Sequence, residues 1–154
     1  MNPYATFRLG DRLFGMDLLV IREINRILDI TPVPRSREHI RGLINLRGQI
    51  VTIIDLAVRL GLPRHEIGDT SHNIILKTAS ELNASSQRNI QGLSMDPVGF
   101  LVDAIGDVVE ADASAIEPLS ANVTEAEARF LSGVIKTSEG LLVLLDLPQI
   151  LRGQ

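Results

Sequence analysis

The side chains best suited to chemistry gather in one short polar stretch of the sequence. His65 and Glu66 are adjacent, and Asp69 and His72 follow within seven residues. Imidazole and carboxylate groups at short spacing are typical ligands of zinc. The cluster falls in a predicted loop, however, and solvated charge is the simpler interpretation of it. We therefore predict neither a metal nor another cofactor.

The rest of the sequence holds no recognisable apparatus for catalysis. Cysteine is absent, which removes thiol nucleophiles and disulfides. No serine stands in a nucleophile-elbow pattern, and the segment from Gly42 to Gly48 lacks the Lys-Ser/Thr pair of a phosphate-binding loop. The carboxylates of Asp103, Asp107 and Glu110 follow one strand-like stretch, where a solvated strand face is the simpler interpretation. The sequence therefore predicts a protein that is not an enzyme.

Composition narrows the class of partner. The 154 residues include 15 Lys+Arg, 19 Asp+Glu and only five aromatic residues, and the net charge is −4. A protein that binds a nucleic-acid backbone needs a clustered basic excess, so we predict no nucleic-acid partner. Charged residues interrupt the N-terminal stretch, and the longest apolar run, Leu141–Leu145, is too short to span a bilayer. We expect a cytoplasmic protein without direct membrane insertion.

The elements that must position any site are mostly strands. Ile, Leu and Val make up fifty residues, enough for a sizeable core. Turn-forming residues bound the predicted strands, which are Tyr4–Leu9, Arg12–Met16, Val20–Ile27, Ile50–Asp55, Asn73–Lys77, Val98–Val102, Val108–Ala111, Gly133–Lys136 and Leu141–Leu145. The last of these is apolar throughout, which suggests a strand covered on both faces. Short helices are predicted at Ser36–Arg41, Asp55–Leu60 and Thr124–Leu131. The polar insert Ala79–Pro97 carries no periodic pattern and predicts a surface loop.

The sequence also repeats. The stretch from Gly42 to Leu56 aligns with the stretch from Gly133 to Leu147 at a constant offset of 91 residues. Upstream, Gly15, Ile21, Ile24 and Pro34 align with Gly99, Ile105, Val108 and Pro118 at a constant offset of 84. We predict two related β units, each marginal alone, that pack together into one body.

One turn stands out within the first unit. Asn45 and Gly48 flank Leu46 and Arg47, and this composition favours a turn with positive φ that projects Leu46 or Arg47 outward. Arg47 has two interpretations of equal weight: it pairs with a nearby carboxylate to hold the turn, or it binds a partner, as arginine often does in interfaces. The pair Arg22–Glu23 lies within an aliphatic run and is interpreted as the solvent face of a strand.

Together these motifs resemble the CheW-like domain of bacterial chemotaxis coupling proteins. The matching segments run in the family's order and cover nearly the whole chain; they are Phe7–Gly10, Phe14–Asp17, Val20–Ile24, Pro34, Ile40–Gly48, Ile50–Leu56, Gly99–Asp103, Val108–Glu110 and Ser132–Val134. The resemblance implies a mainly β fold in which two five-stranded Src-homology-type β-barrels pack around a shared hydrophobic core, with a few short helices. It implies a single CheW-like domain over residues 1–154, with two barrel subdomains.

The resemblance also implies a function. It implies a non-enzymatic adaptor that couples the cytoplasmic tip of methyl-accepting chemoreceptors to the regulatory domain of a CheA-type histidine kinase, in the cytoplasm and in association with receptor arrays. A coupling protein of a non-flagellar pathway, one that controls pili, surface growth or second-messenger output, is an alternative. A small-ligand-binding β-barrel protein is a weaker one, which a polar pocket with converging titratable groups would favour.

The family's receptor contact lies in the groove between the barrels and can be carried over residue by residue. It implies receptor binding by Ile21, Glu23, Asn45, Leu46, Arg47 and Gly48. Three glycines, Gly42, Gly99 and Gly133, are implied either as binding positions or as structural ones that fix tight backbone geometry. The Ala79–Pro97 insert is longer than the short turn usual in the family.

Overall fold

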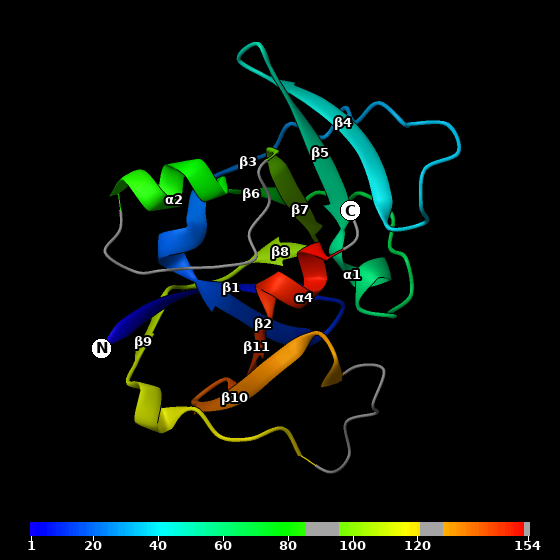
Figure 1. Cartoon of the computed structure of the whole chain (residues 1–154). Helices are drawn as coiled ribbons and strands as arrows, with labels where there is room; N and C mark the ends of the chain where they lie inside the picture. The colour runs from blue at the N-terminus through cyan, green and yellow to red at the C-terminus, as the bar shows by residue number, and fades with distance from the viewer. Residues whose placement is uncertain (86–95, 121–127, 153–154) are drawn as a thin grey trace.

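The computed structural model describes residues 1–85, 96–120 and 128–152, whose strands form two sheets (Figure 1). In order across the first sheet lie β10 (Leu131–Thr137), β11 (Gly140–Leu145), β2 (Arg12–Asp17), β1 (Asn2–Leu9) and β8 (Ala104–Ile105), and β9 (Val109–Ala111) also pairs with β1. In order across the second lie β3 (Ile21–Asn25), β6 (His72–Leu76), β7 (Val98–Val102), β5 (Gln49–Asp55) and β4 (Ile40–Leu46). The predicted mainly β fold is confirmed.

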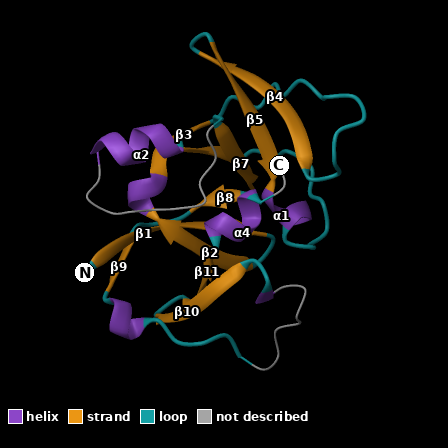
Figure 2. Ribbon diagram, viewed as in Figure 1, coloured by secondary structure: helices purple, strands orange, loops and turns teal. Residues whose placement is uncertain are grey.

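The helices are short and lie at the ends of strands (Figure 2). They are the 3₁₀ turns η1 (Leu18–Val20) and η2 (Ala113–Ala115) and the α-helices α1 (Leu56–Arg59), α2 (Ala79–Ser85) and α4 (Leu147–Leu151). α1 confirms the helix predicted at Asp55–Leu60. Asp55 and Asp146, at equivalent positions of the repeat, accept hydrogen bonds from Val58 N and Gln149 N and so cap α1 and α4.

Three sequence predictions about secondary structure need correction or fall outside the description. The helix predicted at Ser36–Arg41 is wrong, because the Ser36 hydroxyl donates to the Val33 carbonyl in a turn and β4 begins at Ile40. The loop predicted over Ala79–Pro97 is wrong for its first part, which forms α2, while residues 86–95 lie outside the described residues. The first half of the helix predicted at Thr124–Leu131, residues 124–127, also lies outside them; in the second half residues 129 and 130 form a turn and β10 begins at Leu131, so the helix does not extend as far as predicted.

Strand pairing follows the sequence repeat. We call residues 1–62 the first copy and residues 72–151 the second copy. In the first copy Gly42 pairs with Ile53 after a bulge, and 91 residues later Gly133 pairs with Leu144 after a bulge. The parallel pairs Ile53↔Gly99 and Leu144↔Gly15 are likewise related by the offsets of 91 and 84. The two copies therefore adopt the same pairing pattern.

Each sheet nevertheless contains strands of both copies. The first sheet holds β1 and β2 of the first copy together with β8, β9, β10 and β11 of the second, and the direct pairs between the copies are β2–β11, β1–β8 and β1–β9. The second sheet holds β6 and β7 of the second copy together with β3, β4 and β5 of the first, and the direct pairs between the copies are β3–β6 and β5–β7. The chain thus leaves the first sheet at the end of β2, builds the whole second sheet, and returns to the first at β8 (Figure 1). We call this arrangement the strand exchange.

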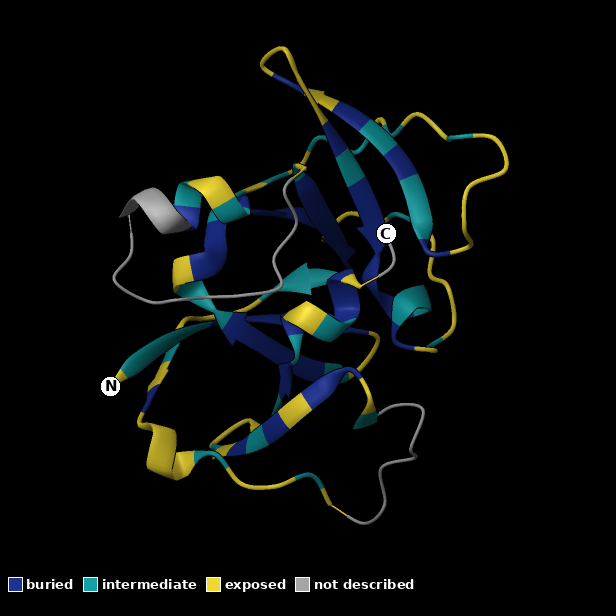
Figure 3. Ribbon diagram, in the orientation of Figure 1, coloured by how far each residue is buried: buried dark blue, intermediate teal, exposed yellow. Residues whose placement is uncertain are grey.

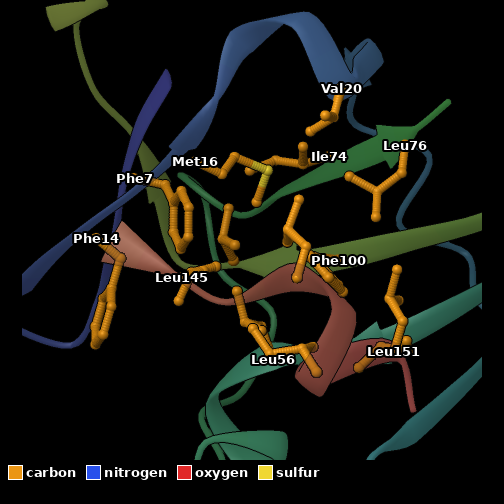
Figure 4. Packing of buried hydrophobic residues seen from close by; sticks show 14 of the residues in the cluster. Phe7, Phe14, Met16, Val20, Leu56, Ile74, Leu76, Phe100, Leu145 and Leu151 are labelled. Atoms are coloured by element: carbon orange, nitrogen blue, oxygen red, sulfur yellow. The ribbon is translucent and has the colours of Figure 1, made fainter. Parts of the chain in front are cut away.

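The core has three parts. The largest cluster joins the two sheets and includes Phe7, Phe14 and Phe100, and Figure 4 shows its side chains converging from β1, β2, β6, β7, β11 and α4. A second cluster lies on the second sheet around Val51, and a third lies on the first sheet around Leu142. Full burial of each large apolar side chain contributes about 1.5–3 kcal/mol, so the shared cluster is the main force that holds the two sheets together.

Candidate functional site

The turn between β4 and β5 lies at the tip of a hairpin that extends from the body of the molecule (Figure 1). Leu46 pairs with Gln49, so the loop has two residues, Arg47 and Gly48, with φ of 53° and 87°. Positive φ at both positions defines a type I′ turn, whose twist matches that of the flanking strands. The Asn45 side-chain oxygen accepts a hydrogen bond from Gly48 N at 2.8 Å. The predicted positive-φ turn is confirmed.

Arg47 of this turn forms an ion pair with Glu23 of β3, through its Nη2 and the Glu23 Oε1. The hydrogen bond from Arg47 lowers the pKa of the Glu23 carboxyl, against a smaller raising effect of burial. The same bond raises the pKa of the Arg47 guanidinium. The Arg47 side chain is still 71% exposed, whereas that of Glu23 is 25% exposed. The pair thus holds the turn against β3 and leaves most of the guanidinium open to solvent. In Figure 3 the tip of the hairpin between β4 and β5 is coloured mostly as exposed.

A second link joins β3 to the same hairpin. A bulge between Ile21 and Glu23 leaves Arg22 without a partner residue in β6. Arg22 Nη1 donates to Gln49 Oε1 at 2.8 Å, and its Nε donates to Glu81 Oε2 of α2 at 3.2 Å. The sequence interpretation of Arg22 as a solvent-facing residue is wrong, because its side chain is only 21% exposed. Nothing in the sequence connects positions 22 and 81, although Thr78 and Glu81 form a recognisable capping box.

Two residues implied as receptor contacts have buried side chains. Leu46 is 3% exposed and packs in the cluster on the second sheet, and Ile21 is 9% exposed and packs in the shared core. Of the two side chains expected to project from the turn, only Arg47 does so. The structure therefore brings Ile21 and Leu46 to the site by their backbones, while their side chains anchor β3 and the hairpin.

The three glycines are explained by close packing. At Gly42, with φ of 149°, a Cβ atom would stand 2.2 Å from the Thr31 carbonyl oxygen. At Gly133 it would stand 2.7 Å from Ile116 Cγ2, and at Gly99 it would stand 2.7 Å from Ile75 Cδ1. No side chain fits at these distances without displacing its neighbour. Of the two alternatives for these glycines, the structure favours the architectural one.

Exposed apolar side chains repeat between the two copies. Ile50, which pairs with Asn45 across the hairpin, is 55% exposed, and its equivalent Leu141 is 54% exposed. Ile24 is 38% exposed, and its equivalent Val108 is 54% exposed. The exposure of Leu141 corrects the prediction that Leu141–Leu145 is covered on both faces. Both copies therefore present apolar side chains to solvent at the same two positions.

A cavity of about 430 Å³ beside β2, β11 and α4 is lined mainly by apolar residues, and its two carboxylates, Asp17 and Asp146, cap η1 and α4. The predicted loop cluster is dispersed, because His65 Nδ1 lies 2.6 Å from Asp103 Oδ2 and His72 Nδ1 lies 2.7 Å from the Thr70 carbonyl.

Across residues 1–85, 96–120 and 128–152, no three His, Asp or Glu side chains stand together as a metal site would require. Within the same ranges, no helix has the length and apolar character needed to cross a bilayer.

These features define a class: a β protein of two related sheets that presents an ion-paired hairpin and repeated apolar positions on its surface. Residues 3–154 match the family model of the CheW-like domain, and the chain belongs to this family.

Named relatives agree with this assignment. The chain is 30% identical over 141 residues to a probable chemotaxis protein CheW of Rhizobium etli, covering 92% of this chain and 81% of that protein. It is 28% identical over 144 residues to the chemotaxis protein CheW of Rhizobium meliloti, covering 94% of this chain and 83% of that protein. Among solved structures, it matches the scaffolding protein TtCheW from Thermoanaerobacter tengcongensis with a TM-score of 0.79 and 28% identity, covering 98% of this chain and 92% of that one.

Proposed function

We propose that this protein is a chemotaxis adaptor that couples methyl-accepting chemoreceptors to a CheA-type histidine kinase by protein–protein contacts alone. Membership of the CheW-like family supports the proposal. The observation that carries it is the repetition of exposed apolar positions, Ile24 and Ile50 in the first copy and Val108 and Leu141 in the second. An adaptor must hold two partners at once, and a duplicated unit supplies two docking surfaces of similar construction.

The first docking surface, which we call the hairpin surface, consists of Glu23, Ile24, Asn45, Arg47 and Ile50. It combines apolar side chains with an exposed arginine, a composition typical of interface hot spots. The Glu23–Arg47 ion pair and the Asn45–Gly48 hydrogen bond fix its geometry before any partner binds, which lowers the entropic cost of association. We assign the receptor tip to the hairpin surface, with Gly48 setting the turn and Ile21 and Leu46 supporting it from the core.

The second docking surface consists of Val108 and Leu141. We assign the kinase regulatory domain to it, because a receptor tip bound at the hairpin surface leaves this second surface open for another partner. Coupling then requires that receptor and kinase each bind two states of the assembly with different affinity, since an equilibrium shifts only by such a difference. A cytoplasmic location at receptor arrays follows from this proposal.

Two single substitutions test the assignment, because each introduces a charge at an exposed position and leaves the core intact. Binding of a receptor-tip fragment and of the kinase regulatory domain is measured by calorimetry for Ile50→Lys and Leu141→Lys. We expect Ile50→Lys to lose receptor affinity only and Leu141→Lys to lose kinase affinity only. Leu19→Lys, at another exposed apolar position, is the matched control. If both variants bind both partners as the unaltered chain does, the proposal is wrong.

The flagellar and non-flagellar versions of this function share the same surfaces. The receptors and kinase that co-purify with the chain from its own cells, identified by mass spectrometry, distinguish them. Association with receptors that control pili or second-messenger output would assign the chain to a non-flagellar pathway.

A further inference from the structure

A chain of hydrogen-bonded side chains leads from the hairpin surface to a buried position in β6. Glu23 binds Arg47 through its Oε1, and its other oxygen, Oε2, accepts a hydrogen bond from Asn25 Nδ2 at 3.4 Å. Asn25 Oδ1 accepts in turn from Asn73 Nδ2 at 3.3 Å. Asn25 of β3 and Asn73 of β6 are register partners, and we call them the amide pair. The Glu23–Arg47 ion pair is thus connected to the inside of the second sheet.

The backbone of Ile27 fixes the direction of both amides. Asn73 Nδ2 donates to the Ile27 carbonyl at 2.7 Å, and Asn25 Oδ1 accepts from Ile27 N at 3.0 Å. A carbonyl only accepts and a backbone N–H only donates, so reversing either amide would set two acceptors or two donors against each other. The NH₂ group of Asn25 is therefore the end that faces Glu23.

Asn73 is a polar residue at a core position. Its side chain is fully buried and shares a face of β6 with Ile75, which belongs to the cluster on the second sheet. Its Oδ1 has no hydrogen-bond partner among the described residues. Because a buried acceptor without a partner costs stability, an apolar side chain would serve packing better here. The contribution of Asn73 therefore lies in its NH₂ donor.

The first sheet shows that the repeat does not require an amide pair at this place. Val109 stands 84 residues after Asn25 and pairs with Tyr4 of β1. This pair takes the place of Asn25 and Asn73, and both of its side chains pack against the cluster on the first sheet. The turn of the corresponding hairpin, residues 137–140, contains no arginine. The amide pair thus belongs to the sheet whose hairpin carries Arg47.

We propose that Asn25 and Asn73 are positioning residues of the hairpin surface, which hold the Glu23 carboxylate in the orientation that binds Arg47. Asn25 acts directly on Glu23, and Asn73 acts by fixing the Asn25 amide. A carboxylate held at both oxygens keeps the guanidinium in place before a partner binds, which lowers the entropic cost of association. The effect on a receptor rests on the proposed function, whereas the positioning is a property of the free chain.

The pKa of the Glu23 carboxyl reports on this arrangement. The charged groups that act on Glu23 are Arg47 and Arg22. The hydrogen bond from Arg47 is the main cause that lowers the pKa, burial raises it, and the hydrogen bond from Asn25 lowers it as well. Since Asn25 donates to the charged form, loss of that donor must raise the pKa of Glu23.

The test is an NMR titration that follows the Glu23 carboxyl in the full chain for Asn25→Val and Asn73→Val. We expect the pKa of Glu23 to rise in Asn25→Val, and to rise by a smaller amount in Asn73→Val, which frees the Asn25 amide to turn. Calorimetry with a receptor-tip fragment should show affinity reduced by about twofold or more in Asn25→Val. Asn2→Val, the same change in β1 of the first sheet, is the matched control and should alter neither quantity.

An unchanged pKa of Glu23 in Asn25→Val, or an equal rise in Asn2→Val, would overturn the proposal, and an unchanged pKa in Asn73→Val would overturn the part assigned to Asn73. A raised pKa together with no binding of the receptor fragment by the unaltered chain would support the positioning and contradict the proposed function. Circular dichroism shows whether each variant is folded. If Asn73→Val does not fold, Asn73→Ser, whose side chain is too short to donate to Asn25, takes its place.

Discussion

Arg59 donates a hydrogen bond from its Nε to the carbonyl of Ile150 at 2.9 Å. Ile150 occupies the position in the second copy that corresponds to Arg59 in the first, 91 residues later. Its Nη2 also donates to the Arg152 carbonyl at 2.8 Å, and its guanidinium lies 4.9 Å from the centre of the Phe130 ring. α1 and α4 therefore meet at the point where the two copies face each other. One side chain of the first copy therefore binds backbone carbonyls at the C-terminal end of α4 in the second copy.

Replacement of Arg59 by Ala is expected to lower the free energy of unfolding by about 1–3 kcal/mol, because it removes the hydrogen bonds to the carbonyls of Ile150 and Arg152 and the contact with the Phe130 ring. Urea unfolding measures this change. Arg152→Ala is the control, since only its backbone carbonyl takes part in the contact. Equal stability of the two variants would contradict a structural role for the Arg59 side chain.

The glycines permit a graded test of packing. Gly42→Ala is expected to destabilise the protein by about 2–4 kcal/mol, because its Cβ would strike a backbone carbonyl and φ is positive. Gly133→Ala should cost less, since its φ is not positive and its Cβ would stand 2.9 Å from the nearest backbone atom, the Glu117 carbonyl oxygen, against 2.2 Å at Gly42. Gly68→Ala, which meets nothing within 4 Å, should be nearly neutral. Thermal unfolding ranks the three variants, and a different order would contradict this account.

The Arg22–Glu81 link makes part of the stability depend on pH. The hydrogen bond from Arg22 lowers the pKa of Glu81 below its ordinary value of 4.5. Because the folded-state pKa is lowered, this stabilisation is fully present above the ordinary pKa and is lost as pH falls through the lowered value.

Glu81→Gln should therefore destabilise the protein at about pH 6, and its difference from the unaltered chain should vanish as the pH falls through the lowered pKa of Glu81. Urea unfolding at a series of pH values measures the difference. Glu139→Gln, at an exposed position in the turn between β10 and β11, serves as the control. A constant difference between Glu81→Gln and the unaltered chain at all pH values would exclude the link as the source.

Arg47 is expected to act at the receptor interface. Arg47→Ala should weaken binding of a receptor-tip fragment by about tenfold or more while kinase binding stays unchanged. Glu23→Gln, which keeps the guanidinium but removes its charged partner, separates the two interpretations of Arg47. If Glu23→Gln reduces receptor affinity as strongly as Arg47→Ala, positioning of the turn dominates; if its loss is smaller, direct contact by Arg47 dominates. Unchanged receptor affinity in Arg47→Ala would exclude it as an anchor.

The strands and the turn at Arg47 could be predicted from the sequence, because local residue patterns determine them. All nine predicted strands are present within a few residues of their predicted bounds, and the positive φ of Arg47 follows from Asn45 and Gly48. β4 was missed because Gly42 and the bulge at Arg41 interrupt its alternation. The burial of Leu46 escaped prediction because the face of β4 that packs against the core depends on strand register, which the local pattern around the turn does not determine.

Features that depend on distant pairing could not be predicted. The link between Arg22 and Glu81 joins positions 59 residues apart, and α2 gains its place from Leu82, which packs in the shared core. The exposed apolar positions carried a usable signal, since Ile50 and Leu141 align in the repeat. Their exposure could not be inferred from the alignment alone, because an apolar side chain in a strand is buried more often than not.

Because of the strand exchange, neither copy of the repeat can form a complete sheet by itself. A single copy, such as residues 72–151, supplies part of each sheet and completes neither. Its strands would find their missing neighbours only in a second molecule, in the manner of a domain-swapped homodimer. The present chain can thus be regarded as such a dimer joined end to end. Either half expressed alone should associate in pairs, and the two halves mixed should rebuild the parent fold.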